Sequence, residues 1–344
     1  MNTRSLPTGS IVYGRLPPGC KLCQEGLKTI IFLTGLCPLS CFYCPLSTFR
    51  KNRDVTFVNE VQVDESNLDR TAVLEVLRSA SRGASLTGGE PLVKVETASR
   101  IIRSLKDTFG EKFHIHLYTS AVPLTNRSVE KLVDSGLDEL RIHAPRDILE
   151  EKLRIASEYK DKLLIGLEYP ALPGNSERLF ELAETAEKYE AAFMNLNELE
   201  FTETNSSSLL LRGYKMRKDY RSAMGSKETA LDVIRRAEEK GLNLTIHFCP
   251  VRVKDYQQTG LRYYRAANLL ARPYQLVTDD GTTLEVTYTE LKQEKKHIAE
   301  YYRSSQIHFF LMDAVKQGKI VERSPLLNWM SLEETPLDQE KSEA

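Results

Sequence analysis

Six short apolar segments in the first 201 residues alternate with longer segments of helical periodicity. The apolar segments are rich in aliphatic and β-branched residues, which is typical of buried strands. They cover residues 27–35, 82–88, 113–119, 137–144, 162–169 and 192–201. Between them, apolar residues recur every three or four positions, as in amphipathic helices, at residues 68–82, 95–109, 128–135, 147–160 and 176–189. This alternation predicts an α/β fold of parallel βα units, a partial (β/α)6 TIM-like barrel closed by right-handed crossovers.

The pattern changes after residue 201. Residues 202–225 predict a long loop or lid, followed by a helix at 226–241, a strand at 242–248 and a hairpin at 273–289. The hairpin is expected to turn at Asp280-Gly281, and helices are expected near 290–318. We therefore predict an N-terminal extension (1–26), a barrel core (27–205), a lid with a C-terminal α+β extension (206–330) and a disordered acidic tail (331–344).

Composition and charge narrow the class of protein only slightly. The 344 residues are 41% hydrophobic, enough for a sizeable core, and the formal net charge of -1 carries no general nucleic-acid signature. The N-terminal residues lack the apolar stretch of a secretory signal, and no run approaches the roughly 18 apolar residues of a membrane span. These features predict a cytoplasmic protein without a transmembrane segment. In that compartment clustered cysteines favour metal or redox chemistry over disulfides.

Three of the six cysteines, Cys37, Cys41 and Cys44, lie within eight positions directly after the first predicted strand. Ligands bind at the carboxyl ends of barrel strands, so this loop is expected at the functional rim. Soft thiolates suit iron–sulfur clusters and zinc. Four cysteines ordinarily hold an electron-transfer cluster, so three at this spacing would leave one iron of a cubic cluster open to a small molecule. The alternative is a structural zinc site, which needs a fourth ligand from elsewhere.

The segment CPLSCFYC at 37–44 resembles the C-x3-C-x-aromatic-C signature of the radical S-adenosylmethionine (SAM) superfamily, with Tyr43 at the aromatic position. LTGGEP at 86–91 resembles the superfamily's Gly-Gly-Glu motif, which implies that Gly88, Gly89 and Glu90 hold the amino group of SAM. Further segments resemble a largely archaeal group of radical SAM proteins related to the pyruvate formate-lyase activating enzyme, from which no particular activity carries over. These segments are residues 113–119, 135–143, 195–205, 211–214 and 225–230.

The resemblance implies an oxygen-sensitive enzyme with a [4Fe-4S] cluster on Cys37, Cys41 and Cys44. A one-electron donor such as ferredoxin or flavodoxin would reduce the cluster, and reductive cleavage of SAM would give a 5′-deoxyadenosyl radical. That radical would take hydrogen from a substrate of unknown identity: RNA, protein, lipid or metabolite. Activation of a glycyl-radical partner is one of the alternatives.

Position at the strand ends adds further candidates for SAM binding. Thr119 and Ser120 follow the third predicted strand, Glu168 lies on the fifth, and Arg141 and His143 lie on the fourth. Each residue type also serves commonly as a structural polar group. The sixth strand is crowded with amides and carboxylates, which are costly inside a barrel unless paired. Asn195 and Asn197 share one parity, and Glu198 and Glu200 share the other, so one of these two pairs is expected to face the barrel interior.

The other three cysteines suggest a second metal site. Cys20 and Cys23 form a C-x2-C pair before the first strand, and Cys249 follows the strand at 242–248, beside His247. The three cysteines could hold an auxiliary iron–sulfur cluster, or, together with His247, a Cys3His zinc site. The alternative is that they are free cysteines packed as small apolar residues.

Arginine, lysine and tyrosine cluster at residues 212–221 and 252–265. This composition suits phosphates and stacked bases, and equally suits an ordinary solvated surface. It supports two hypotheses: an RNA substrate for the enzyme, and a protein of another class, a non-catalytic zinc-binding module for nucleic-acid or protein interaction. An anaerobic preparation would separate the classes, because an iron–sulfur protein is brown.

Overall fold

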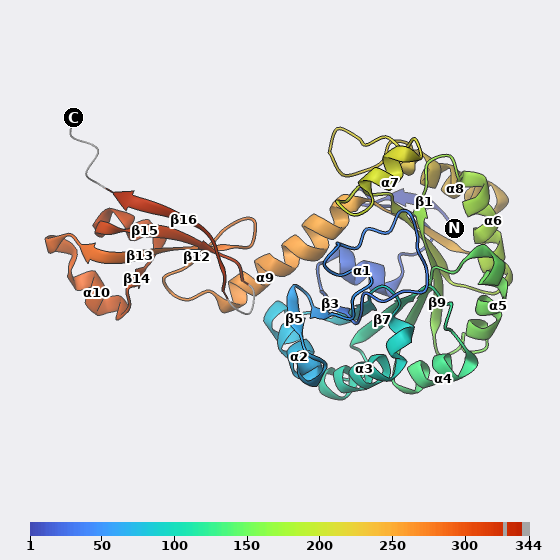
Figure 1. Ribbon diagram of the computed structural model, residues 1–344, viewed down its shortest axis with the longest axis horizontal. Coiled ribbons are helices and arrows are strands. Elements are labelled where there is room, and N and C mark those ends of the chain that lie inside the picture. The colour runs from blue at the N-terminus through green and yellow to red at the C-terminus, as the bar shows by residue number, and fades with distance from the viewer. Residues whose placement is uncertain (326–328, 339–344) are drawn as a thin grey trace. The chain divides into compact units, whose positions relative to one another are not determined.

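The computed structural model describes residues 1–325 and 329–338, which divide into two compact units (Figure 1). The first unit comprises residues 1–76 and 81–258, and the second comprises residues 77–80 together with the described residues from 259 onward. No helix among these residues is long and apolar enough to cross a membrane.

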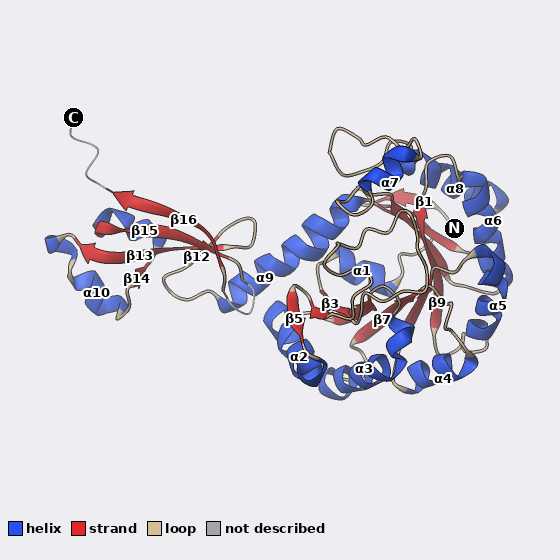
Figure 2. Ribbon diagram, viewed as in Figure 1, coloured by secondary structure: helices blue, strands red, loops and turns tan. Residues whose placement is uncertain are grey.

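A curved sheet with seven parallel strands forms the centre of the first unit, in the order β3-β6-β7-β8-β9-β10-β11. The strands are β3 (Lys28–Phe32), β6 (Gly83–Thr87), β7 (His114–Thr119), β8 (Glu139–Ile142), β9 (Leu164–Ala171), β10 (Phe193–Glu198) and β11 (Thr245–Cys249). Helices surround the strands (Figure 2): α2 (Leu68–Ser79), α3 (Val95–Phe109), α4 (Asn126–Asp134), α5 (Arg146–Ser157), α6 (Ser176–Lys188) and α8 (Ser226–Lys240). The predicted α/β partial TIM barrel is confirmed.

The barrel extends beyond its predicted end at residue 205. β11 pairs in parallel with β10, from Phe193 opposite Thr245 to Asn197 opposite Cys249, so it is a seventh barrel strand. Residues 202–225, predicted as a lid, and α8 form the crossover that leads into it; this segment carries the short helix α7 (Ser206–Leu211). The helix and the strand of this last βα unit were predicted, but the long irregular crossover before them separated them from the regular alternation that defined the predicted barrel.

The N-terminal residues are part of the barrel unit and not a separate extension. β2 (Ile11–Tyr13) pairs antiparallel with β11, and β1 (Thr3–Ser5) pairs with β2. At the other edge β4 (Thr56–Val58) pairs antiparallel with β3, and β5 (Val61–Val63) with β4. The helix α1 (Pro18–Gln24) lies within the ring of strands (Figure 1). Its place there is fixed in part by the Gly19 N–H, which donates to Glu139 Oε2 at 3.2 Å.

Alternation along the strands separates an apolar face from a polar interior. One set of residues is buried in the main core with residues from the helices: Ile115, Leu117, Leu140, Ile142, Leu167, Met194, Leu196, Ile246 and Phe248. The set of opposite parity lines the inside of the barrel: Tyr118, Arg141, Glu168, Asn195, Asn197, His247 and Cys249. Polar groups in a barrel interior are costly unless partnered, so this interior is suited to ligands and not only to packing.

The second unit is built on a sheet in the order β12-β13-β15-β16, with β14 paired to β13. Its strands are β12 (Leu276–Val277), β13 (Thr283–Leu291), β14 (Gln306–Ile307), β15 (Val315–Arg323) and β16 (Ser331–Asp338), and its helices are α9 (Leu261–Leu270) and α10 (His297–Tyr302). The predicted hairpin is present as β12 and β13. The helices expected near 290–318 are wrong except for α10 and short 3-10 turns.

The tail expected from residue 331 onward is partly ordered. β16 forms because it pairs antiparallel with β15, with Ile320 opposite Thr335. The local sequence of residues 331–338 does not predict this pairing. Residues 339–344 of the predicted tail lie outside the described residues.

Candidate active site at the carboxyl ends of the strands

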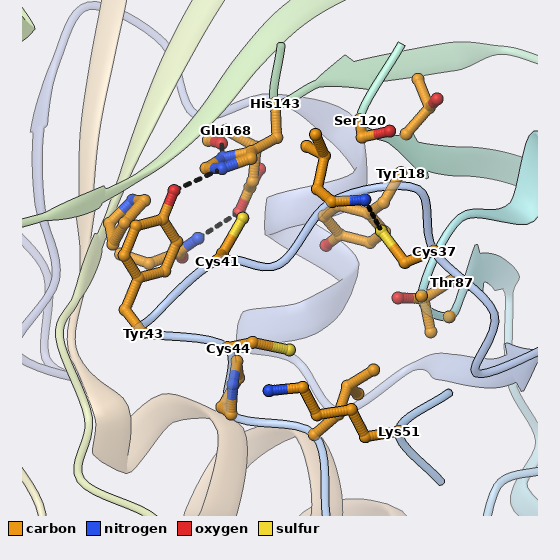
Figure 3. Close-up of a pocket in the computed structure, with 18 of the residues that line it drawn as sticks. Cys37, Cys41, Tyr43, Cys44, Lys51, Thr87, Tyr118, Ser120, His143 and Glu168 are labelled. Atoms are coloured by element: carbon orange, nitrogen blue, oxygen red, sulfur yellow. Dashed lines mark hydrogen bonds between the residues drawn. The ribbon is translucent and has the colours of Figure 1, made fainter. Parts of the chain in front are cut away.

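A cavity of about 310 Å³, called the outer cavity here, opens at the carboxyl ends of the barrel strands. Cys37, Cys41 and Cys44, on the loop after β3, all line it, together with the Gly88-Gly89 turn after β6. Figure 3 shows the three thiols around this pocket with Thr87, Ser120 and Glu168 from neighbouring strands. The structure therefore brings together the two motifs found in the sequence.

Hydrogen bonds from β8 and the lid segment hold the cysteine loop in place. The Tyr43 hydroxyl lies 2.8 Å from His143 Nε2, and His143 Nδ1 lies 2.7 Å from the backbone carbonyl oxygen of Glu168. Because that carbonyl can only accept, Nδ1 carries the proton and Nε2 accepts from Tyr43. Burial lowers the pKa of His143, so the ring stays neutral in this role. The Asn205 side chain donates to the Tyr43 carbonyl oxygen at 3.0 Å.

The glycine turn lies directly against the cysteine loop. Gly89 N–H donates to the Thr34 carbonyl oxygen at 2.7 Å, and Glu90 N–H donates to that of Leu36 at 2.7 Å. A Cβ on Gly88 would lie 2.4 Å from the Thr34 carbonyl oxygen, and a Cβ on Gly89 would lie 2.4 Å from that of Leu36. Glycine is therefore required here by the approach of two backbones.

We expect Gly89→Ala to separate the turn from the cysteine loop. The added Cβ meets backbone carbonyl oxygens, which cannot rotate away as a side chain would, so a cost of about 1–3 kcal/mol in unfolding free energy is expected, along with a loss of iron binding. The control is Gly174→Ala, whose Cβ meets no heavy atom within 4 Å and carries only the strain of its φ of +82°. Chemical denaturation and iron content after anaerobic reconstitution check this; equal iron in both variants would contradict it.

Groups of the protein itself donate hydrogen bonds to both oxygens of the Glu90 carboxylate. It accepts from Leu92 N–H at 2.8 Å, from Thr119 Oγ1 at 2.8 Å and from Ser120 N–H at 2.6 Å, and also from the Ser120 hydroxyl. Burial raises its pKa in spite of these donors. Gly88, Gly89, Thr119 and Ser120 line the cavity, whereas the fully buried Glu90 ties the ends of β6 and β7 together.

A buried ion network crosses the interior below the cysteine loop. The Arg141 guanidinium donates to Glu139 Oε1 at 2.6 Å and to Glu168 Oε2 at 3.2 Å. Asn195 and Asn197 donate to the two oxygens of Glu168 at 2.8 and 2.7 Å. Although burial opposes it, Arg141 lowers the pKa of Glu139 to about 2. Glu168 lines the cavity with both oxygens already accepting hydrogen bonds, so a ligand there would meet a rigid carboxylate.

A second cavity, of about 270 Å³, lies inside the barrel and contains the other three cysteines. Cys20, Cys23, His247 and Cys249 all line it. It borders the first cavity, because six residues line both: Thr87, Tyr118, Arg141, Glu168, Asn197 and Lys254. Among the described residues no three His, Cys, Asp or Glu side chains converge as they would around one metal ion. Burial raises the pKa of Cys20 to about 11 and lowers that of His247 to about 3.

Sequence reasoning misplaced one of the basic residues, Lys254. Lys254, grouped with a surface cluster, instead lines both cavities and pairs with Glu200 at 2.8 Å. Arg221 pairs with Glu200 and Asp255, and the Arg212 guanidinium lies 4.4 Å from the ring centroid of Phe42. Lys254 follows β11 in a π-helical segment, Val253–Gly260, whose position at a strand end was the signal that could have identified it.

Comparisons with known proteins identify the family. The sequence profile of the Radical SAM superfamily matches residues 31–145. A Methanocaldococcus jannaschii protein, named as a candidate glycyl-radical enzyme activating enzyme, is 36% identical over 318 residues, covering 88% of this chain and 81% of its own length. The chain belongs to the radical SAM superfamily. Within it, the chain is related to the pyruvate formate-lyase activating enzyme, as its motifs predicted.

Solved structures match parts of this chain at low sequence identity. The crystal structure of Streptococcus suis SuiB bound to precursor peptide SuiA has a TM-score of 0.48 and 12% identity, covering 67% of this chain and 51% of that one. SuiB bound to S-adenosylmethionine has a TM-score of 0.47 and 13% identity, covering 93% and 65%. This chain thus spans only about half to two thirds of the length of those proteins.

The residues present fit the superfamily's cofactors, a [4Fe-4S] cluster and SAM. Three thiols on one loop line one cavity, which is the donor set for a cluster with an open iron. The backbone turn at Gly88-Gly89 and the hydroxyl-bearing residues Thr119 and Ser120 line the rest of that cavity.

Proposed function

We propose that this protein binds a [4Fe-4S] cluster through Cys37, Cys41 and Cys44 and uses it to modify a substrate through SAM. When bound and reduced by an external one-electron donor, the cluster would supply the electron for cleavage of SAM to methionine and a 5′-deoxyadenosyl radical. The observation that carries the proposal is the shared cavity of the three thiols and the Gly88-Gly89 turn.

The chain's own residues would orient SAM and exclude water. The backbone at Gly88 and Gly89 would lie against the SAM amino group, with Glu90 fixing the turn, and Thr119 and Ser120 would face the ribose. Tyr43 would hold the cysteine loop through His143. Glu168, fixed by the ion network, would lie on the inner side of the pocket.

The substrate is proposed to be modified directly in the barrel. Support comes from the second cavity, called the inner cavity here, which is lined by thiols and borders the outer cavity proposed to bind SAM. Cysteines beyond the cluster loop suggest that the enzyme acts on the substrate itself. We also propose that Cys20, Cys23 and Cys249 bind a second metal, as an iron–sulfur cluster or, with His247, as zinc. A ferredoxin or flavodoxin in the cytoplasm would supply the electron.

Activation of a glycyl-radical partner is the second candidate, because the Methanocaldococcus relative is named for that role. The partner would then be a protein, whose glycine reaches the SAM pocket. An RNA substrate has less support, because Arg221 and Lys254 are paired with carboxylates.

Anaerobic purification followed by dithionite and SAM tests the proposal. A brown protein that forms 5′-deoxyadenosine is expected. A colourless protein that contains only zinc and forms no 5′-deoxyadenosine would instead favour the non-catalytic zinc-binding module. Comparing metabolites, lipids and RNA nucleosides between parent and deletion cells under anaerobic conditions would then show the substrate class.

A further inference from the structure

The inner cavity collects thiols from two elements that lie far apart in the sequence. Cys20 and Cys23 lie three positions apart on α1, so they face the same side of that helix. Cys249 ends β11, more than 200 residues later, with the same parity as His247. Cys20 is 5% exposed and Cys23 is 9% exposed. All four side chains line one cavity, which surface cysteines or isolated core cysteines would not do.

Two nitrogen donors lie against the Cys20 sulfur, as hydrogen-bond donors do around metal-bound sulfurs. Arg141 Nη2 and Asn195 Nδ2 each lie 3.2 Å from Cys20 Sγ, so two donors point at it. Hydrogen bonds to ligating sulfurs stabilise the thiolate and tune a cluster's potential. A cysteine that only packs as a small apolar residue does not need two such hydrogen-bond donors.

His247 offers a free nitrogen to the same cavity. Its Nδ1 lies 3.1 Å from Asn195 Oδ1. The Asn195 amide orientation is set by its NH2 group, which donates to Glu168 Oε2 at 2.8 Å. Oδ1 therefore accepts, Nδ1 carries the proton, and Nε2 keeps its lone pair. Nε2 is buried without a hydrogen-bond partner among the described residues, and the side chain is 1% exposed. A ring N–H held by a carbonyl oxygen is the usual support of a metal-ligating histidine.

We propose that Cys20, Cys23, Cys249 and Nε2 of His247 ligate an iron–sulfur cluster inside the barrel, with Asn195 as the residue that orients His247. Zinc would need all four ligand atoms within about 2.0–2.3 Å of one point. The four side chains instead border a space of about 270 Å³, which suits a cluster better than a single ion. The shared lining residues place this cluster next to the SAM pocket. The inference rests on the proposed second metal site and not on SAM cleavage.

The test uses the full-length variant Cys37→Ala/Cys41→Ala/Cys44→Ala, reconstituted anaerobically with iron and sulfide. We expect it to retain iron and acid-labile sulfide. Once reduced, it should show a nitrogen hyperfine coupling in pulsed electron paramagnetic resonance. Adding His247→Cys should keep the cluster, abolish the coupling and move the reduction potential to a more negative value, because histidine ligands raise it. Adding Cys20→Ala and Cys249→Ala should remove the iron.

His116→Asn is the matched control for His247→Cys. His116 is also a fully buried barrel histidine with an unpartnered ring nitrogen among the described residues, but it does not line the inner cavity. It should leave the nitrogen coupling in place. Zinc alone, no metal, or a coupling that is missing at the start or survives His247→Cys would each overturn the inference. If the parent enzyme cleaves no SAM while the triple variant keeps the histidine-linked cluster, only the proposed function fails.

Discussion

Replacing Cys44 by alanine is expected to reduce reductive SAM cleavage to the background of the assay mixture. Cys44 lines the outer cavity with Cys37 and Cys41, and a cubic cluster held by two thiols has no third anchor to fix its open iron toward SAM. The measurement is 5′-deoxyadenosine formed with dithionite and SAM, together with iron bound per chain.

Ser47→Ala is the control for this loss, because Ser47 is on the same loop with an exposed side chain. That variant should keep the iron and the rate of the parent protein. Undiminished 5′-deoxyadenosine from Cys44→Ala would show that the three-cysteine loop is not the SAM site, and the proposed function would then have to be abandoned.

The sequence was informative where chemistry lies in a short segment at the end of a regular strand. Cys37, Cys41 and Cys44 follow β3 within one loop, and Gly88 and Gly89 follow the neighbouring strand β6. Parallel pairing brings the carboxyl ends of adjacent strands together, so predicting the strands was enough to predict that the two motifs meet.

The same reasoning failed where partners come from distant parts of the chain. The need for glycine at positions 88 and 89 is an example. These glycines lie close to the backbone carbonyl oxygens of Thr34 and Leu36, and no local sequence pattern predicts that contact. Likewise, α1 sits inside the ring of strands, where the Gly19 N–H donates to Glu139, 120 residues away. Such contacts depend on tertiary closure, for which propensity and periodicity carry no signal.

For the polar residues inside the barrel, the sequence predicted the inward orientation but not the hydrogen-bond partners. Alternation on β10 predicted that one set of polar residues would face inward, and Asn195 and Asn197 do line the inner cavity. What they bind there, the carboxylate of Glu168 on β9, follows only from the register that places Asn195 opposite Glu168. Arg141, a candidate contact to SAM on its position alone, lines the cavity with the three thiols and is the central cation of this network.

Arg141→Met is therefore expected to destabilise the barrel unit strongly. The Arg141 side chain is 3% exposed and neutralises Glu139, which is fully buried, as well as Glu168. Removing one partner of a buried ion pair leaves an uncompensated charge, which costs about 3–5 kcal/mol. Urea unfolding of the metal-free full-length protein at neutral pH, followed by far-ultraviolet circular dichroism, measures the change in unfolding free energy.

Two further variants separate loss of charge balance from loss of packing. Arg235→Met removes an exposed arginine that pairs with Asp232 and Glu239 on α8, so it should cost no more than about 1 kcal/mol. Arg141→Met/Glu139→Gln removes a buried cation and a buried anion together and should recover part of the stability lost in Arg141→Met. If the double variant is as unstable as the sum of its single changes, the stabilising role of Arg141 lies in packing and its hydrogen bonds, and not in neutralising Glu139.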